Sequence, residues 1–112
     1  MGEIRSLYGE NTAFLNADSN GGTDIEMVAA KANHIIVVDY LAVGMSAAGL
    51  FFLESGASTV ISPTLYVQAS DTVVLDHEYL VQTVVGEALN FNATITGNVS
   101  FLLKYHYEPT FT

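Results

Sequence analysis

The sequence contains no cysteine among its 112 residues, so neither a disulfide framework nor a thiolate metal site is possible. Positive charge is also scarce, with 3 Lys and Arg against 12 Asp and Glu and a formal net charge of -9. Binding to a phosphate backbone needs clustered cations, and anionic membrane surfaces attract basic segments. The composition therefore argues against a nucleic-acid partner and against a membrane partner.

Long apolar runs and targeting segments are missing too. No stretch approaches the roughly 18 unbroken apolar residues of a membrane-spanning helix. The first residues, 1–14, lack the basic start and the apolar run of a secretory signal. Because the chain begins at Met1 without such a signal, we expect a protein made in the cytosol.

Sequence patterns of catalysis are absent as well. The chain has no nucleophile elbow, and its Gly21-Gly22 pair lacks the lysine of a phosphate-binding loop. A cupin-like metal enzyme would require the distant histidines His34, His77 and His106 to converge with a carboxylate. His77 lies between two acids, but neighbouring residues of a strand point to opposite faces. We expect a protein that is not an enzyme and that carries no cofactor.

One polar segment invites comparison with a calcium site. Four Asn or Asp residues lie within 16–24, around a pair of glycines. Aligned with the calcium loop of an EF-hand, however, the position that needs a bidentate glutamate is Met27. Turns rich in Asn and Asp explain the segment without a metal, so we predict no metal site.

Half of the residues are hydrophobic, whereas only 13% are charged. That is an unusually small charged fraction for a single domain. Either uncharged polar residues cover the surface, or part of the surface is buried in an oligomer, and both can hold. A chain of this length forms one domain and buries roughly two-thirds of its unfolded surface, enough for a sizeable core.

Strand patterns recur along the chain, with breaks roughly every eight to twelve residues. No convincing amphipathic helix is present, and 76–83 is ambiguous between a turn and a short helix. We therefore predict an all-β fold of about eight strands, a β-sandwich or a barrel. An N-terminal arm and loop would occupy 1–23, and the sandwich 24–112. The expected strands are 12–16, 25–30, 34–43, 50–55, 59–61 with 64–68, 71–75, and two long strands within 84–107.

The segment 84–107 predicts a closing hairpin, because apolar and polar residues alternate on both sides of a Gly-Asn pair. A two-residue loop at 97–98 would place a polar row opposite an aromatic one. A three-residue loop at 96–98 instead pairs Phe91 with Leu103, so that apolar residues lie opposite apolar residues and polar residues lie opposite polar ones. Since a one-residue slip moves every side chain to the other face, we predict the three-residue loop.

Three segments resemble a known class of proteins. HIIVVDYLAVG at 34–44 is an aliphatic strand, GLFFLESG at 49–56 is an aromatic strand, and VVGEALNFNATITGNVSFLLKYHYE at 84–108 alternates throughout. The chain from about Ile25 to Glu108 resembles the small β-sandwich structural proteins of tailed bacteriophages in the residue pattern of these three segments. Several such proteins are capsid decoration or cement subunits, often trimers on the outer shell, and others are tail or fibre modules.

The resemblance favours the sandwich and implies an antiparallel, jelly-roll-like one. It also implies a non-enzymatic virion structural protein on the capsid surface, made in the cytoplasm of the host. Its partners would be the major capsid protein and copies of itself in a homotrimer. The alternative is a tail- or fibre-associated module that binds a carbohydrate or a receptor. We expect Tyr105 in the core and assign interfaces to apolar residues of the N-terminal segment and to two further tyrosines. The predicted interface residues are Ile4, Leu7, Tyr8, Phe14, Tyr66 and Tyr79.

Overall fold

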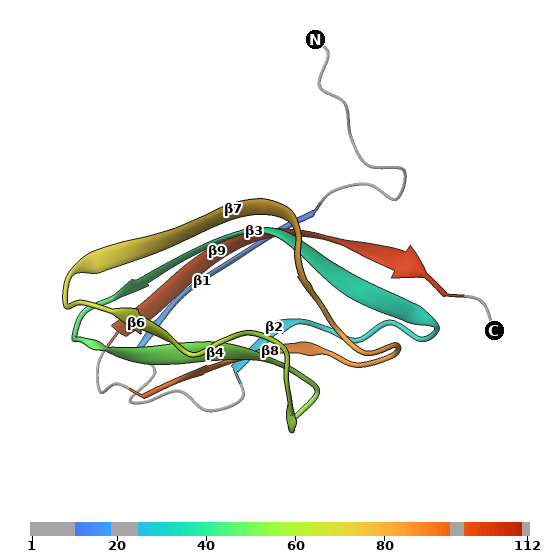
Figure 1. Cartoon of the computed structure of the whole chain (residues 1–112), viewed down its shortest axis with the longest axis horizontal. Coiled ribbons are helices and arrows are strands. Elements are labelled where there is room, and N and C mark those ends of the chain that lie inside the picture. The colour runs from blue at the N-terminus through green and yellow to red at the C-terminus, as the bar shows by residue number, and fades with distance from the viewer. Residues whose placement is uncertain (1–10, 19–24, 95–97, 111–112) are drawn as a thin grey trace, which may run out of the picture.

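The computed structural model describes residues 11–18, 25–94 and 98–110, with only the backbone described for 11–18. Within these ranges the chain forms nine strands in two facing antiparallel sheets and no helix (Figure 1). The strands are β1 (Asn11–Asp18), β2 (Ile25–Val28), β3 (His34–Met45), β4 (Gly49–Ser55), β5 (Thr59–Val60), β6 (Leu65–Val67), β7 (Asp71–Gln82), β8 (Leu89–Ala93) and β9 (Asn98–Pro109).

The order of the strands defines the topology. One sheet has the order β1-β9-β3-β7, and the other has β2-β8-β4-β5, with β6 also beside β4. Apart from the two-residue β5, the strands pair from the two ends of the chain inward: β1 with β9, β2 with β8, β3 with β7 and β4 with β6. This nested pairing across two sheets is a jelly roll. The predicted all-β, jelly-roll-like sandwich is confirmed.

The predicted closing hairpin within 84–107 is wrong. β8 pairs with β2 and β4 in one sheet, whereas β9 pairs with β1 and β3 in the other. Phe91 therefore lies opposite Leu53 rather than Leu103. The alternation placed Phe91, Phe101 and Leu103 in the core, but Asn90, Asn92 and His106 of the opposite set are buried as well. A period of two also does not specify which strand lies alongside. Residues 96 and 97 of the predicted loop lie outside the described residues, and its third residue, Asn98, begins β9.

The segment 76–83 is neither a turn nor a short helix, because β7 runs through it to Gln82. The strand is interrupted by a large bulge. Val38 pairs with Val81 and Tyr40 with Asp76, so residues 77–80 of β7 lie opposite one residue of β3. Tyr79 at the bulge has a φ of 56°, in the left-handed region that an aromatic residue rarely adopts. We call 77–80 the β7 bulge.

The core lies between the sheets and is built from inward-facing residues of both. Three phenylalanines form its centre: Phe51 and Phe91 stack with ring centroids 5.4 Å apart, and Phe101 from the other sheet lies 5.6 Å from Phe91. Tyr105 packs against this core, as predicted. The largest fully buried apolar side chains are Phe51, Phe91, Ile36, Leu41, Leu53, Leu89, Leu103, Val37, Val38, Val43 and Val67.

Candidate functional site

Two of the predicted interface residues have described side chains, and these lie in different sheets. Tyr66 in β6 and Tyr79 in the β7 bulge are 58% and 54% exposed, but they belong to different sheets. Phe14 lies in β1, opposite Leu102 of β9, and its side chain is not described. β1 thus places 11–18 in the sandwich itself, although we expected the sandwich to begin at residue 24. Three of the residues lie outside the described part of the chain: Ile4, Leu7 and Tyr8.

The outer face of the β1-β9-β3-β7 sheet has an uncharged centre. Val74, Ala42 and Leu102 are neighbours in one cross-strand row, and Val74 and Leu102 are 54% and 36% exposed. Gly44 lies in the adjacent row, between a threonine of β7 and a serine of β9. These two rows form what we call the outer patch: Ala42, Gly44, Thr72, Val74, Ser100 and Leu102.

The outer patch is hollowed because its central residues are small. A Cβ atom on Gly44 would lie 3.3 Å from Oγ of Ser100, so a larger residue would fill the depression. Among the described side chains, the next row carries charge, and there the Lys104 ammonium lies 5.7 Å from the centre of the Tyr40 ring. A partly apolar centre with a polar rim is compatible with the anatomy of a protein interface.

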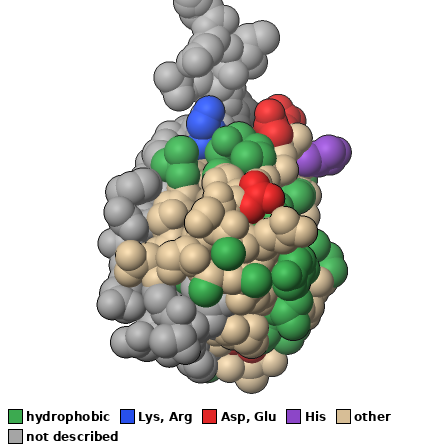
Figure 2. Space-filling model, turned by 90° about the vertical axis from the view of Figure 1, so that its left-hand side faces the viewer, with side chains coloured by type: hydrophobic (Ala, Val, Ile, Leu, Met, Phe, Trp, Pro, Cys, Tyr) green, Lys and Arg blue, Asp and Glu red, His purple; other side chains and the backbone are tan. Residues whose placement is uncertain are grey.

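One end of the sandwich is shown in Figure 2. Hydrophobic and uncharged polar groups cover most of its described surface, and charged side chains are few. This agrees with the charged fraction of only 13%. Such a face is compatible with a surface of uncharged polar residues and with a surface buried in an assembly.

A cluster of charged and polar side chains lies where β3 and β7 bulge, and the row of Tyr40 and Lys104 separates it from the outer patch. His106 of β9 is 2% exposed, and its Nδ1 lies 2.6 Å from Oδ2 of Asp39. Its Nε2 lies 2.7 Å from Oε2 of Glu108, to which the hydroxyl of Tyr79 also donates. The backbone N–H of Tyr79 donates to Oδ1 of Asp39 at 3.0 Å. We call Asp39, Tyr79, His106 and Glu108 the histidine cluster.

The histidine cluster favours a protonated imidazole. Burial acts to lower the pKa of His106, but hydrogen bonds and charge from Glu108 and Asp39 outweigh it and raise the pKa above its ordinary value. Burial acts to raise the pKa of Glu108, but hydrogen bonds from Tyr79 and His106 lower it overall. Since both ring nitrogens face carboxylates, the imidazolium form satisfies both as donors. The arrangement suits a structural ion cluster, because neither nitrogen is free for a substrate.

The pKa shifts predict how stability depends on pH. The contribution of His106, whose pKa is raised, is complete below about 6.5 and is lost as the pH rises through its folded-state value. The contribution of Glu108, whose pKa is lowered, is complete above about 4.5 and is lost on acidification. We expect the cluster to stabilise the fold most between these two values. Urea unfolding from pH 4 to about pH 9 at constant ionic strength measures this dependence.

The acidic chain also repels itself increasingly as the pH rises, so the cluster must be separated from this background. Glu108→Gln keeps a hydrogen-bonding group but removes one charge beside His106. The difference in unfolding free energy between wild type and variant should shrink above pH 6.5. A difference that stays constant from pH 5 to about pH 9 would show that His106 does not titrate as described.

The other histidines have separate surroundings. Nδ1 of His34 lies 2.8 Å from the carbonyl oxygen of Ala32, and Nδ1 of His77 lies 2.6 Å from that of Glu78. Within the described ranges, no group of three or more His, Asp or Glu side chains is arranged to hold a metal ion. Most of the Asn- and Asp-rich segment 16–24 lies outside those ranges.

Sequence reasoning missed the histidine cluster. One signal was present, since Asp39 interrupts the aliphatic run HIIVVDYLAV, and an acid within a central strand requires a partner. The partners come from β7 and β9, far along the chain, and only the strand order brings them together.

Comparisons with known proteins identify no family: no protein-family model matches this chain, and neither does any curated protein. None of the described residues belongs to a helix that could span a membrane.

Proposed function

We propose that this protein is a non-enzymatic virion structural protein, a capsid decoration or cement subunit on the outer surface of an assembled phage head. The main support is the outer patch, an uncharged and partly apolar surface in the middle of a sheet, with Val74 and Leu102 exposed. The jelly-roll topology adds support, because this fold recurs in viral shells. So does the resemblance of 34–44, 49–56 and 84–108 to phage structural proteins.

The outer patch of one copy would contact a different surface of the next copy. Such a contact closes into a ring of three, a homotrimer, when the rotation between subunits is one third of a turn. Such a trimer would bridge neighbouring copies of the major capsid protein. Because it binds the assembled shell but not its separate subunits, it would raise the free energy of disassembly.

Co-sedimentation tests the capsid proposal. Purified protein is mixed with phage heads that lack it and is centrifuged through a sucrose gradient. We expect it to sediment with the heads in a fixed ratio to the capsid protein and to raise the temperature at which the heads release DNA. Protein that stays at the top of the gradient at all concentrations would contradict the proposal.

A charge placed in the outer patch should prevent self-association. Val74→Lys would bury an ammonium in the proposed contact, so we expect the association constant to fall at least about tenfold. Folding should change little, because the side chain is exposed in the single chain. The measurement is the solution mass by light scattering after size exclusion.

Val60→Lys is the matched control. Val60 is 56% exposed against 54% for Val74, but it lies in β5 of the other sheet. We expect this variant to associate like wild type. Equal loss of association in both variants would show that general surface polarity, rather than the outer patch, governs assembly.

A second candidate is the tail or fibre module that binds a carbohydrate. Tyr66 supports it, because its ring is 58% exposed beside Leu50, which is 40% exposed, and jelly-roll lectins are common. An aromatic ring of this kind can stack on a sugar. Glycan-array binding that disappears in Tyr66→Ala and persists in Val74→Lys would favour this function over capsid decoration.

A further inference from the structure

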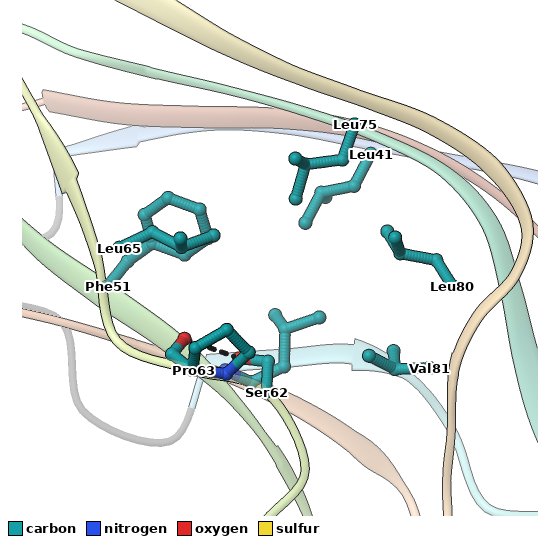
Figure 3. A pocket seen from close by; sticks show the side chains of 9 residues that line it. Leu41, Phe51, Ser62, Pro63, Leu65, Leu75, Leu80 and Val81 are labelled. Atoms are coloured by element: carbon teal, nitrogen blue, oxygen red, sulfur yellow. Dashed lines mark hydrogen bonds between the residues drawn. The ribbon is translucent and has the colours of Figure 1, made fainter.

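An apolar pocket lies between the two sheets, near the edge formed by β6 and β7 (Figure 3). Its volume is about 170 Å³. Leu41, Leu75 and Leu80 enter it from the β1-β9-β3-β7 sheet, and Phe51 and Leu65 enter from the opposite sheet. The pocket faces the interior of the sandwich, so it is separate from the outer patch.

The local fold explains why this space is not filled. β6 has only three residues, and the chain before it breaks at Ser62-Pro63, so the sheet is short on this side. On the opposite side, the β7 bulge takes 77–80 out of regular pairing with β3. The two sheets are therefore both irregular at the same edge, and side chains line a pocket there instead of interlocking.

The chemistry of the lining excludes a charged or strongly polar occupant. Apart from Ser62, the residues that line the pocket have apolar side chains. The hydroxyl of Ser62 accepts the N–H of Leu53 at 2.8 Å and donates to the carbonyl of Pro63 at 3.0 Å. In the described part of the chain, no buried side-chain polar atom lacks a hydrogen-bond partner. A polar ligand would lose its hydration here and gain no hydrogen bond from these side chains in return.

We propose that this pocket binds one small uncharged apolar molecule, of the size of a single aromatic ring or a hydrocarbon of about six to eight carbons. An apolar cavity of about 150 Å³ in another protein stays free of water and accepts benzene, so a space of about 170 Å³ fits an occupant of that size. The ring of Phe51 offers an aromatic contact. The gain comes from removing the ligand's apolar surface from water.

Toluene is a suitable probe, and methyl NMR of the intact chain locates it. We expect saturable shifts of the leucine methyls at 41, 65 and 75, with a Kd on the order of 0.1–1 mM. No shifts up to the solubility limit of toluene would overturn the proposal. Shifts confined to Val74 and Leu102 would also overturn it, because they would place the ligand on the outer patch.

Leu80→Phe should fill the pocket and abolish toluene binding, since the larger ring occupies the same space. Leu102→Phe is the matched control, because it adds the same volume at a residue that is 36% exposed on the outer patch. We expect this control to bind toluene like wild type. Toluene binding that survives in folded Leu80→Phe would contradict the assignment.

A second comparison uses the wild-type protein alone, so it holds even if Leu80→Phe does not fold. Benzylamine has the ring of toluene but carries a charged ammonium, and we expect it to bind at least about tenfold more weakly. Equal affinity would overturn the proposal. The proposal would also be overturned if the methyl signals of the pocket shifted when phage heads were added but never when toluene was added. The occupant would then be a side chain of a protein partner.

Discussion

Phe91→Ala is expected to lower the free energy of unfolding by about 3–5 kcal/mol. Phe91 is fully buried, stacks on Phe51 and contacts Phe101 of the opposite sheet. Truncation to alanine removes these contacts and leaves a cavity where the two sheets meet. The loss would be a large part of the roughly 5–15 kcal/mol that stabilises a typical domain. Urea denaturation followed by tyrosine fluorescence and circular dichroism measures the change.

Tyr66→Ala is the control for this prediction. It also replaces an aromatic ring by a methyl group, but that ring is 58% exposed. We expect a change within about 0.5 kcal/mol. If both variants lost the same stability, the stacked phenylalanines would not be the centre of the core.

The second large effect is expected for His106→Leu. Leucine fills similar space but leaves the carboxylates of Asp39 and Glu108 facing each other without the cation between them. Removing one member of a buried ion cluster costs about 3–5 kcal/mol. The side chains of Asp39 and Glu108 are 11% and 18% exposed. We therefore expect the free energy of unfolding to fall by an amount near the lower end of this range, about 3 kcal/mol. The measurement is urea unfolding at about pH 5.5, between the ordinary pKa values of the two residue types.

Two variants separate the cluster from a general effect of losing a histidine. His77→Leu changes an exposed histidine and should shift stability by less than about 0.5 kcal/mol. Adding Asp39→Asn and Glu108→Gln to His106→Leu removes the unpaired charges, and this triple variant should recover part of the loss. A triple variant that is still less stable than His106→Leu would show that desolvated charge is not the cause.

Much of the fold could be predicted from the sequence, because the pattern of apolar residues determines which faces are buried. The run from 34 to 43 did become the long central strand β3, and the aromatic strand from 50 to 55 became β4. The apolar pattern could not predict which strands lie side by side in a sheet. The alternation in 84–107 fits a hairpin as well as two strands in different sheets, because a period of two fixes the face of a residue and not its neighbouring strand.

The candidate sites were harder to predict, because they depend on pairing between distant strands. The outer patch is formed where Ala42, Val74 and Leu102 become neighbours across three strands. The histidine cluster needs the bulges at Asp39 and 77–80, which bring Tyr79 of β7 to His106, with ring centroids 5.6 Å apart. No local pattern in a single sequence specifies a bulge of four residues.

The proposed role on a virion requires that this chain associate through its outer patch, and the solution mass of the purified protein tests that requirement most directly. Light scattering after size exclusion should give three times the 12.0 kDa of one chain for wild type and for Val60→Lys. It should give the mass of one chain for Val74→Lys. A wild-type mass of 12.0 kDa at every concentration up to saturation would contradict the trimer and leave the outer patch without its proposed role.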